Sequence, residues 1–586
     1  MAGLSPVGDG PAFVVFFSIF LYPVGGGMLY WSQLFTRVFP EEDVEMKHRT
    51  VNDYFKQQWP RLILFAAFTL GVSFFAPLKN FQLKWLIDSK SKQEALGYMG
   101  LVFAITFSSW FFERLSRRSF TKIACGAVEQ VRQRILEQVL HRTVAQYNAE
   151  GDAAYLSLLT TDLRTLYDDY YMSLFSIVFW GGIMLCALAM YLYISPVMLL
   201  AILLVTIPPL VLPRRMNERL KATRDAFSLQ MADYTQQLKE LLGGFEIIRS
   251  FLREDAYAAL HQKAARKARE SELDYQQSLN AMVTNTSLIS NLIFPVVMLV
   301  GLFLAFDGRL TMGTVSTAAS MANFVITPCH QIAQCWAKVR SSKGIRQRLE
   351  AAMSGPEEVS AGRAIGKLER IECKDTGFAY PGAAAPVLRG VRMTVSGQEK
   401  AVLVGESGCG KSTLAKLLFQ YYPDYTGSIL FNGQQLRGID RQSLYQRVGY
   451  IAQTTYLFND TLRSNICLGA DFPEAQLSHA IETAGLTDWV STLPDGLDTL
   501  ISENGKNLSG GQRQRIGIAR LALRRYDLII ADEITASLDP DTSGQVMENL
   551  LALPCMVVAI THDVSGAFMK QFDKVYRVEH GSVSRA

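Results

Sequence analysis

The first half of the chain is dominated by long apolar runs that are separated by polar segments. A helix needs about 20 mostly apolar residues to cross the hydrocarbon core of a bilayer, and six runs meet or approach that length. They cover residues 60–87, 95–113, 170–194, 196–213, 281–306 and 312–337. Only Ile194–Ser195 separates the third run from the fourth, and only Asp307–Leu310 separates the fifth from the sixth. The pattern predicts a polytopic α-helical membrane domain over residues 50–340, in which these pairs form tight hairpins.

The other connections are long, polar and rich in Lys and Arg. Residues 114–169 and 214–280 have a helical pattern, and the first of them carries Arg114, Arg117 and Arg118. Because basic segments stay on the cytoplasmic side, these two arms are expected in the cytoplasm and the hairpins outside. An even number of spans then returns the C-terminal half of the chain to the cytoplasm.

Residues 1–49 contain a further apolar segment. Residues 11–35 include Pro23 and Gly25–Gly27, which break or weaken a helix. An extra membrane helix with an external N-terminus and a re-entrant or interfacial segment both remain open. No basic stretch precedes the apolar run, so it does not resemble a cleaved signal peptide. Residues 50–59 are expected to form an amphipathic elbow on the inner leaflet.

The pattern changes near residue 366. Short β-branched runs alternate there with glycine turns and amphipathic helices, which is typical of an α/β domain with a largely parallel sheet. We predict this domain over residues 366–586, with residues 341–365 as a linker. A hydrophobic content of 49% in 586 residues suits such a fusion, and a net charge of +4 is too small to indicate nucleic-acid binding. The eight cysteines show no paired spacing, so free thiols are expected.

A glycine-rich loop lies between a predicted strand and a predicted helix. It comprises Gly405, Glu406, Ser407, Gly408, Cys409, Gly410, Lys411, Ser412 and Thr413. This is the P-loop pattern in its required context, in which glycines let backbone N–H groups approach phosphates and the helix N-terminus adds a positive dipole. Lys411 is expected to reach the β- and γ-phosphates of a nucleotide, and the Ser412 hydroxyl to ligate Mg²⁺.

A second candidate is a pair of carboxylates at the end of an apolar run. Residues 528–533 read Leu-Ile-Ile-Ala-Asp-Glu. Asp532 is expected to hold Mg²⁺, directly or through water, and Glu533 to polarise the attacking water. A surface acidic pair is the alternative, and the P-loop in the same domain argues against it.

The order of these motifs resembles that of the ABC ATPases. Leu508-Ser-Gly-Gly-Gln512 matches the signature sequence of that family, and further residues match its other motifs. The resemblance implies that Tyr380 stacks on adenine, that Gln453 joins the Mg²⁺ site and links it to the membrane domain, that His562 contacts the γ-phosphate, and that Ser509, Gly510, Gly511, Gln512 and Asp539 lie at the nucleotide between two subunits. Residues 535–539 read Thr-Ala-Ser-Leu-Asp where relatives often show Thr-Ser-Ala-Leu-Asp, a departure of little expected consequence.

Other segments resemble the exporter-type half-transporters. They are Leu457–Ile466, Glu503–Gly505, Tyr147–Asp152 and Glu240–Phe251. The resemblance implies the six-helix exporter fold with domain-swapped arms. It also implies that the signature of one subunit seals the P-loop of another, so that a dimer binds ATP and Mg²⁺. A homodimer is slightly favoured over a heterodimer with a sister chain.

The sixth apolar run carries a polar stripe. At about 100° per residue, its polar side chains fall on one arc. The stripe consists of Ser316, Ser320, Asn323, Thr327, His330, Gln331 and Gln334, and Asn285 and Asn291 add polar groups in the fifth run. Such groups either line a translocation pathway or join helices by hydrogen bonds. His330 is a weak proton-relay candidate beside the alternative of a packed histidine.

The leading function is ATP-driven export of an amphipathic small molecule, lipid or peptide by alternating access. Import on the same fold, for example of a metal–siderophore complex, is the close alternative, because Pro208, Pro209 and Pro213 are able to unwind the fourth span. An ATP-gated channel or regulator is less favoured, because Glu533 and His562 are intact. The expected location is the bacterial inner membrane, with the ATPase domain in the cytoplasm and the transported solute unidentified.

Overall fold

The structure is a computed structural model that describes residues 50–354, 362–383, 385–534, 540–562 and 566–585. Contacts divide the chain into two compact units. The first unit comprises the described residues up to Leu140 together with Ala153–Gly355. The second comprises His141–Asp152 and Pro356–Ala586. The expected extra helix at residues 11–35 lies outside the described residues. All eight cysteines are free thiols.

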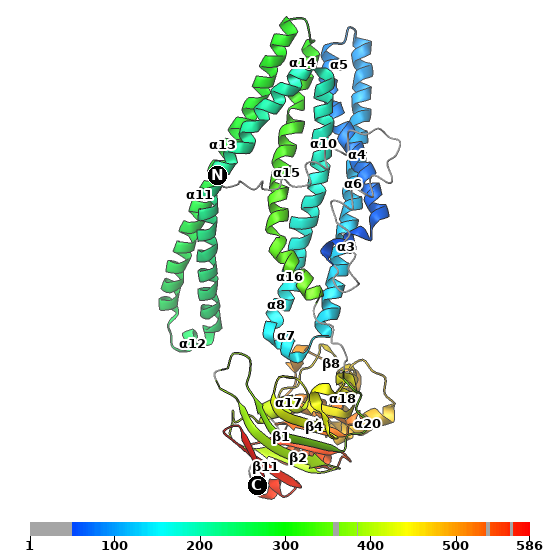
Figure 1. Ribbon diagram of the computed structural model, residues 1–586, viewed down its shortest axis with the longest axis vertical. Helices are drawn as coiled ribbons and strands as arrows, with labels where there is room; N and C mark the ends of the chain where they lie inside the picture. Colours follow the sequence, from blue (N-terminus) through cyan, green and yellow to red (C-terminus); the bar gives the residue numbers. More distant parts are fainter. Residues whose placement is uncertain (1–49, 355–361, 384, 535–539, 563–565, 586) are drawn as a thin grey trace, which may run out of the picture. The chain divides into compact units, whose positions relative to one another are not determined.

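The first unit is entirely helical (Figure 1). Some helices are much longer than a membrane is thick, because the apolar spans continue into the polar arms without a break. The helices are α3 (Val51–Lys56), α4 (Trp59–Leu78), α5 (Gln82–Ile87), α6 (Lys92–Leu140), α8 (Asp152–Ser157), α9 (Leu163–Thr165), α10 (Met172–Ile194), α11 (Pro196–Gly243), α12 (Phe245–Ser250), α13 (Glu254–Phe306), α14 (Met312–Met321), α15 (Asn323–Ser341) and α16 (Lys343–Met353). Two π-helical segments, η2 (Leu158–Asp162) and η3 (Leu166–Tyr171), flank α9.

Three helical stretches among the described residues are long and apolar enough to cross a membrane. They are Trp59–Ile87, Lys92–Leu140 and Asp152–Ile194, and shorter apolar stretches occur at Pro196–Ile207 and Asn291–Phe306. The first stretch is interrupted by the 3₁₀ turn η1 (Lys79–Phe81). The sixth predicted span is divided at Ala322, between α14 and α15. Both spans therefore contain a local departure from the α-helical pattern that the apolar runs did not predict.

The two predicted hairpins are present. Ser195 alone separates α10 from α11, and residues 307–311 separate α13 from α14. By contrast, α11 runs as one helix through positions 208–213, so the prolines there do not unwind the fourth span. The structural argument for the importer alternative is thereby lost.

The predicted elbow is the short helix α3. Thr50 and Asp53 form a capping box at its start, which satisfies two backbone donors that a helix N-terminus leaves open. Val51 and Tyr54 are buried, so the helix is held by its apolar side.

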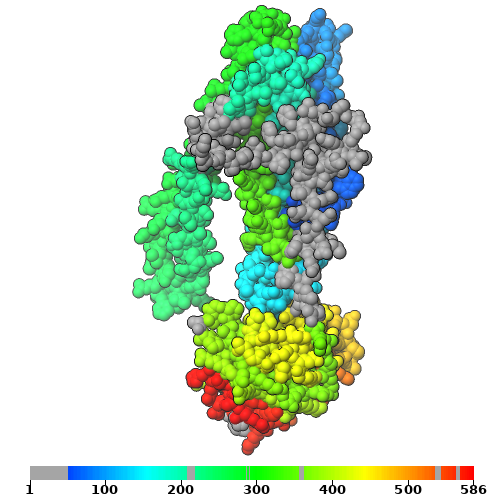
Figure 2. Space-filling model, in the orientation of Figure 1, coloured from blue at the N-terminus to red at the C-terminus, as the bar shows by residue number. Residues whose placement is uncertain are grey.

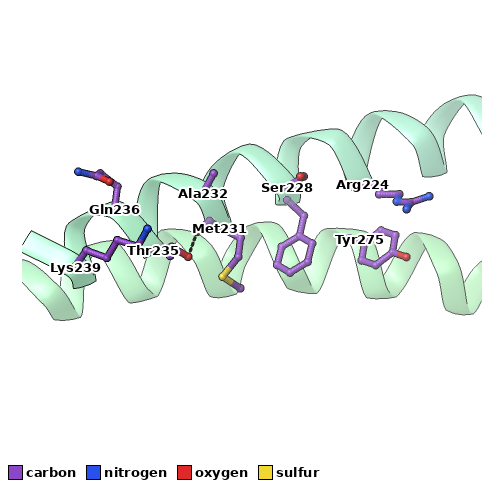
Figure 3. Close-up of a pocket in the computed structure, with 9 residues that line it drawn as sticks. Arg224, Ser228, Met231, Ala232, Thr235, Gln236, Lys239 and Tyr275 are labelled. Carbon is purple, nitrogen blue, oxygen red and sulfur yellow. Dashed lines mark hydrogen bonds between the residues drawn. The ribbon is translucent and has the colours of Figure 1, made fainter. Parts of the chain in front are cut away.

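Helices α11 and α13 pack along each other and form the second arm, with α12 at its tip (Figures 1 and 2). Phe227 of α11 stacks on Tyr275 of α13, with ring centroids 5.8 Å apart. Beside this stack lies an open pocket of about 550 Å³, lined by α11 residues and Tyr275 (Figure 3). Most side chains of the arm are exposed in the single chain.

The second unit is built on two sheets, of which the larger is the largely parallel sheet that the α/β pattern predicted. The larger sheet has the order β12-β11-β3-β10-β9-β6 and is parallel except for β12. Its strands are β3 (Lys400–Val404), β6 (Val448–Ile451), β9 (Leu528–Asp532), β10 (Met556–Thr561), β11 (Lys574–Glu579) and β12 (Ser582–Arg585). The smaller, antiparallel sheet has the order β2-β1-β4-β5, with β1 (Arg370–Phe378), β2 (Leu388–Ser396), β4 (Thr426–Phe431) and β5 (Gln434–Gln435).

Helices and a small ribbon complete this unit. The ribbon pairs β7 (Asp460–Thr461) with β8 (Leu500–Ile501). The helices are α7 (Val144–Glu150), α17 (Lys411–Leu418), α18 (Arg441–Arg447), α19 (Leu462–Cys467), α20 (Glu474–Thr483), α21 (Thr487–Thr492), α22 (Gly510–Ala522), α23 (Pro540–Leu551) and α24 (Gly566–Met569), with 3₁₀ turns at Leu436–Gly438, Gly496–Asp498 and Glu503–Gly505.

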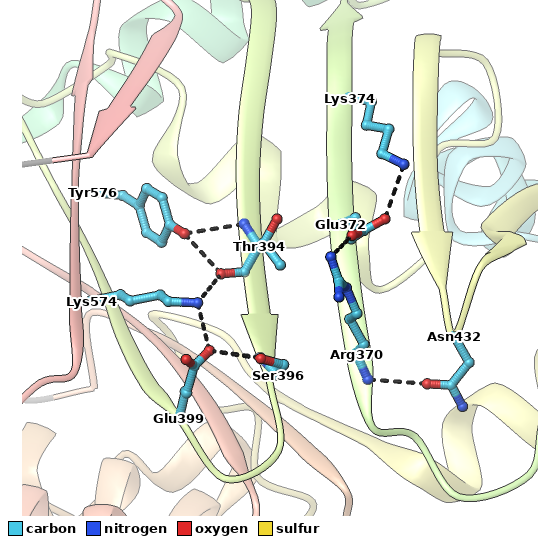
Figure 4. A network of polar contacts seen from close by, with 9 residues as sticks. All are labelled: Arg370, Glu372, Lys374, Thr394, Ser396, Glu399, Asn432, Lys574 and Tyr576. Atoms are coloured by element: carbon cyan, nitrogen blue, oxygen red, sulfur yellow. Dashed lines mark hydrogen bonds and ion pairs between the residues drawn. The ribbon is translucent and has the colours of Figure 1, made fainter.

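A polar network joins the two sheets (Figure 4). The Tyr576 hydroxyl of β11 donates to the Thr394 carbonyl of β2 at 2.8 Å, and the Lys574 ammonium donates to the same carbonyl at 3.0 Å. Lys574 also pairs with Glu399 at 2.7 Å. Glu399 in turn accepts from the Ser396 backbone N–H at 2.8 Å. These bonds fix the smaller sheet against the edge of the larger one.

Candidate active site

The glycine-rich loop connects β3 to α17, as predicted. Gly410 has φ +110°, a conformation that side chains rarely allow, and a Cβ there would lie 2.7 Å from Leu388. A Cβ on Gly405 would lie 2.3 Å from the Val578 carbonyl oxygen. Glycine is therefore needed at both positions, and the loop closes tightly enough for its N–H groups to face one ligand.

The Lys411 side chain folds back over this loop. Its ammonium donates to the carbonyls of Gly405 and Glu406, each at 2.8 Å, and only 4% of the residue is exposed. The charge is thus fixed at the loop, beside the start of α17, where a phosphate is expected. Ser407, Gly408 and Cys409 complete the turn.

Tyr380 lies beside the same helix. Its hydroxyl is 3.0 Å from the Thr413 hydroxyl, and its half-buried ring packs edge-on against Phe378 and Tyr422, with centroids 5.0 and 5.4 Å away. The structure therefore brings the predicted adenine-stacking residue to the P-loop helix.

Asp532 is the last residue of the buried strand β9 and is 2% exposed. The Ser412 hydroxyl donates to its Oδ1 at 2.9 Å, and the Tyr450 hydroxyl of β6 donates to its Oδ2 at 3.4 Å. Burial raises the pKa of Asp532 above its usual range, and repulsion from Glu533 adds to the effect. Sequence reasoning missed Tyr450, because no spacing rule connects it to the carboxylate.

Glu533 is held from two sides. Gln453 donates to its Oε2 at 2.7 Å, and His562 Nε2 lies 2.6 Å from its Oε1. Its backbone has φ +51°, which is uncommon outside glycine and indicates a strained position. The three residues follow β6, β9 and β10, whose carboxyl ends meet at one edge of the parallel sheet. Such an edge is where open α/β sheets bind ligands.

The signature residues start α22. Ser509 is the N-cap: its hydroxyl accepts from the Gln512 N–H at 3.2 Å, and the Gln512 side chain accepts from the Ser509 N–H at 2.8 Å. With Gly510 and Gly511 they form a helix N-terminus that suits an anion. Ser509 is exposed, and within the described ranges no hydrogen bond joins it to the P-loop. Asp539 lies outside the described residues.

The predicted pathway residues lie on α13 and α15. Asn323, Thr327 and Gln334 are exposed in the single chain, whereas His330 and Gln331 are half-buried. Asn285 and Asn291 of α13 are exposed.

Family models agree with this architecture. Residues 388–536 match the model for the ABC transporter domain, and residues 57–329 match the model for the ABC transporter transmembrane region. Together they cover well over half of the chain, which therefore belongs to the ABC transporters.

Relatives indicate the kind of transporter. The chain is 27% identical over 550 residues to the ATP-dependent lipid A-core flippase of Salmonella typhimurium, covering 90% of this chain and 94% of the relative. The flippase of the same name from Aromatoleum aromaticum is 26% identical, with 89% and 90% covered. A bacterial Atm1-family ABC exporter solved with ATP bound superimposes with a TM-score of 0.76 at 22% identity, covering 91% of this chain and 95% of that one.

The chain is accordingly an exporter-type half-transporter. It is an integral membrane protein that binds nucleotide and couples ATP hydrolysis to transport. The relatives do not favour the importer that the sequence left open.

Proposed function

We propose that the chain exports an amphipathic lipid across a bacterial inner membrane as a dimer that hydrolyses MgATP. The proposal rests mainly on the similarity to lipid flippases over nine-tenths of both chains. In this proposal residues 50–340 form the membrane domain, residues 341–365 the linker and residues 366–586 the ATPase domain.

The residues of the candidate site suit Mg²⁺. The Ser412 hydroxyl and the Asp532 carboxylate are oxygen ligands held 2.9 Å apart beside the P-loop, and Mg²⁺ prefers oxygen ligands. Gln453 would approach the same ion. Bound there, Mg²⁺ neutralises charge on the phosphates. Lys411 holds the phosphates by its charge, and Tyr380 positions the base.

Glu533 is proposed as the group that polarises the attacking water. Both of its carboxylate oxygens are occupied, one by Gln453 and the other by His562. Movement of either partner would free a further lone pair of Glu533 for the attacking water. Nucleotide binding would draw His562 toward the γ-phosphate and thereby release one oxygen. Hydrolysis would then occur only when a nucleotide with a γ-phosphate is bound at the site.

The proposed dimer follows from the separation of the two halves of the nucleotide site. One chain provides the P-loop, the carboxylates and His562, whereas Ser509 presents an exposed helix N-terminus that forms no bond to them in the described ranges. A second copy would bring its Ser509, Gly510 and Gly511 to the γ-phosphate. A homodimer needs no other chain, and a sister chain with the same motifs would serve equally.

The proposed pathway includes Asn323, Thr327, His330, Gln331 and Gln334. Polar side chains exposed on a membrane helix are costly in lipid and usually face a cavity. Asn285 and Asn291 would face the same space from α13.

Proteoliposomes that contain a fluorescent lipid analogue test the proposal. ATP added outside should move the analogue from the leaflet on the ATPase side to the opposite leaflet, and vesicles without Mg²⁺ should show no movement. Movement of a soluble dye but of no lipid would refute the lipid assignment.

A further inference from the structure

The first and sixth spans are interrupted at the same place. In a continuous helix the Lys84 N–H would bond to the Asn80 carbonyl four residues earlier. Here the Thr317 hydroxyl of α14 stands between them, because it accepts from the Lys84 N–H at 3.0 Å and donates to the Asn80 carbonyl at 3.3 Å. The inserted side chain accounts for the 3₁₀ turn at Lys79–Phe81. The sixth span tightens into one 3₁₀-type turn at Ala322, five residues after Thr317, where the Ala322 N–H bonds to the Ala319 carbonyl at 3.3 Å.

Two side-chain donors beside these turns lack hydrogen-bond partners. The Asn80 side-chain NH₂ is buried and makes no hydrogen bond in the structure, and buried polar groups are rarely left so. Lys79 makes no hydrogen bond or ion pair with the described residues, and its ammonium lies 5.8 Å from the centroid of the Phe324 ring. A lysine within a membrane span usually marks a substrate or ion path.

Few carboxylates lie on the helices that contact the turn at Lys79. Helix α6 contacts it and carries Glu94, whose carboxylate accepts from the Lys90 N–H at 2.9 Å and from the Tyr98 hydroxyl at 3.1 Å. On α4, α5, α14 and α15 before Lys338, the only carboxylate-bearing neighbour in sequence is Asp88, just after α5. Asp88 is already engaged, since it accepts from the Thr311 hydroxyl at 2.6 Å and from the Gly313 N–H at 3.3 Å. No acidic side chain therefore neutralises the Lys79 ammonium among the described residues of these helices.

The break adjoins the polar stripe of the sixth span. Phe324, under the Lys79 ammonium, follows Asn323, and Thr327 lies one turn further on. Asn323 and Thr327 are exposed. Because Thr317 satisfies the Lys84 N–H and the Asn80 carbonyl, the donors left over at the turn are the side chains of Lys79 and Asn80.

We propose that Lys79 and Asn80 bind the phosphate of the transported lipid headgroup. This inference rests on the proposed lipid export and adds the chemical class of the substrate. The ammonium supplies a point charge, and the amide donates N–H bonds to phosphate oxygens. The break positions both donors beside the polar stripe, so a headgroup that moves along α15 meets them.

The test uses full-length protein in vesicles of zwitterionic lipid with traces of labelled phosphatidylglycerol or labelled phosphatidylcholine. Lys79→Gln should lower ATP-driven flipping of the net-negative phosphatidylglycerol about tenfold, the loss expected when one charge-assisted contact of about 1.4 kcal/mol is removed. Phosphatidylcholine carries the same phosphate but balances it with its own choline cation, so its flipping should fall less than that of phosphatidylglycerol. Lys79→Arg should retain flipping because it keeps the charge, and a wild-type melting temperature for Lys79→Gln shows that this variant folds. Lys90→Gln removes the same charge from the loop after α5 and should behave as wild type.

Three other results would each overturn one part of the proposal. Equal phosphatidylglycerol flipping by Lys79→Gln and wild type overturns the headgroup site while leaving lipid export intact. Wild-type protein that hydrolyses ATP but flips neither lipid overturns the proposed function and this inference with it. If inorganic phosphate stimulates the ATPase of wild type but not of Lys79→Gln, and both flip phosphatidylglycerol equally, the site takes free phosphate instead of a headgroup.

Discussion

Arg520 connects the helix that follows the signature to the segment that follows Gln453. Its guanidinium donates to the Asn465 carbonyl at 2.7 Å, to the Tyr456 carbonyl at 2.9 Å and, more weakly, to the Asn465 side chain at 3.3 Å. Burial lowers the pKa of Arg520 to about 10, so the group remains charged at neutral pH. Arg520→Met keeps much of the apolar stem but removes all three bonds.

The structure sets the size of the effect. Asn465 is fully buried, so its carbonyl would lose its Arg520 donor without water to replace it, at a cost of about 1–3 kcal/mol. Tyr456 is 56% exposed, so water can replace its bond. Relief of the buried charge offsets part of the loss. We expect a net destabilisation of about 2 kcal/mol, which lowers the melting temperature of a domain of this size by about 4–8 °C.

Differential scanning fluorimetry of the full-length protein in detergent measures this shift. Arg524→Met is the matched control, because Arg524 lies exposed just after the same helix and its side chain makes no hydrogen bond or ion pair with the described residues. The control should melt within about 1–2 °C of wild type. Equal shifts for the two variants would refute the role given to the Arg520 bonds.

Two further predictions concern packing and pH. Gly182→Ala places a Cβ 2.3 Å from the Ser73 hydroxyl oxygen, between α10 and α4, and should destabilise the membrane domain by about 1–3 kcal/mol, whereas Gly100→Ala meets nothing within 4 Å and should not lower the melting temperature. Burial acts to raise the pKa of Glu399, but the bonds from Lys574 and Ser396 outweigh it and hold the pKa below its usual range. The stability that Glu399 contributes is therefore present above its unfolded pKa of about 4.3 and is lost as the pH falls through the folded pKa. Lys574→Met should flatten the melting temperature against pH between about pH 5 and 3, and an unchanged acid profile would contradict this cause.

Local patterns predicted much of the architecture. Apolar runs and basic arms placed the spans and hairpins, because the bilayer constrains length and charge along the chain. The P-loop could also be predicted, since Gly405, Gly410 and Lys411 lie in one short segment and act together there. The alternation of strands and helices gave the parallel sheet.

Contacts between distant segments were not predictable in this way. The break at Lys79–Phe81 depends on Thr317, which is 233 positions from Lys84 and lies on another helix. Tyr450 reaches Asp532 only because β6 and β9 are adjacent in the sheet. Gln453 and His562 were found by resemblance to a family, because nothing in their spacing indicates that both reach Glu533.

The central claim is that hydrolysis at Glu533 drives outward transport. Hydrolysis and lipid movement measured in the same proteoliposomes, for wild type and Glu533→Gln, test it most directly. Wild type should consume ATP and move lipid away from the ATPase side, whereas the variant should bind ATP but do neither. Wild-type hydrolysis by Glu533→Gln, or lipid movement toward the ATPase side, would contradict the account.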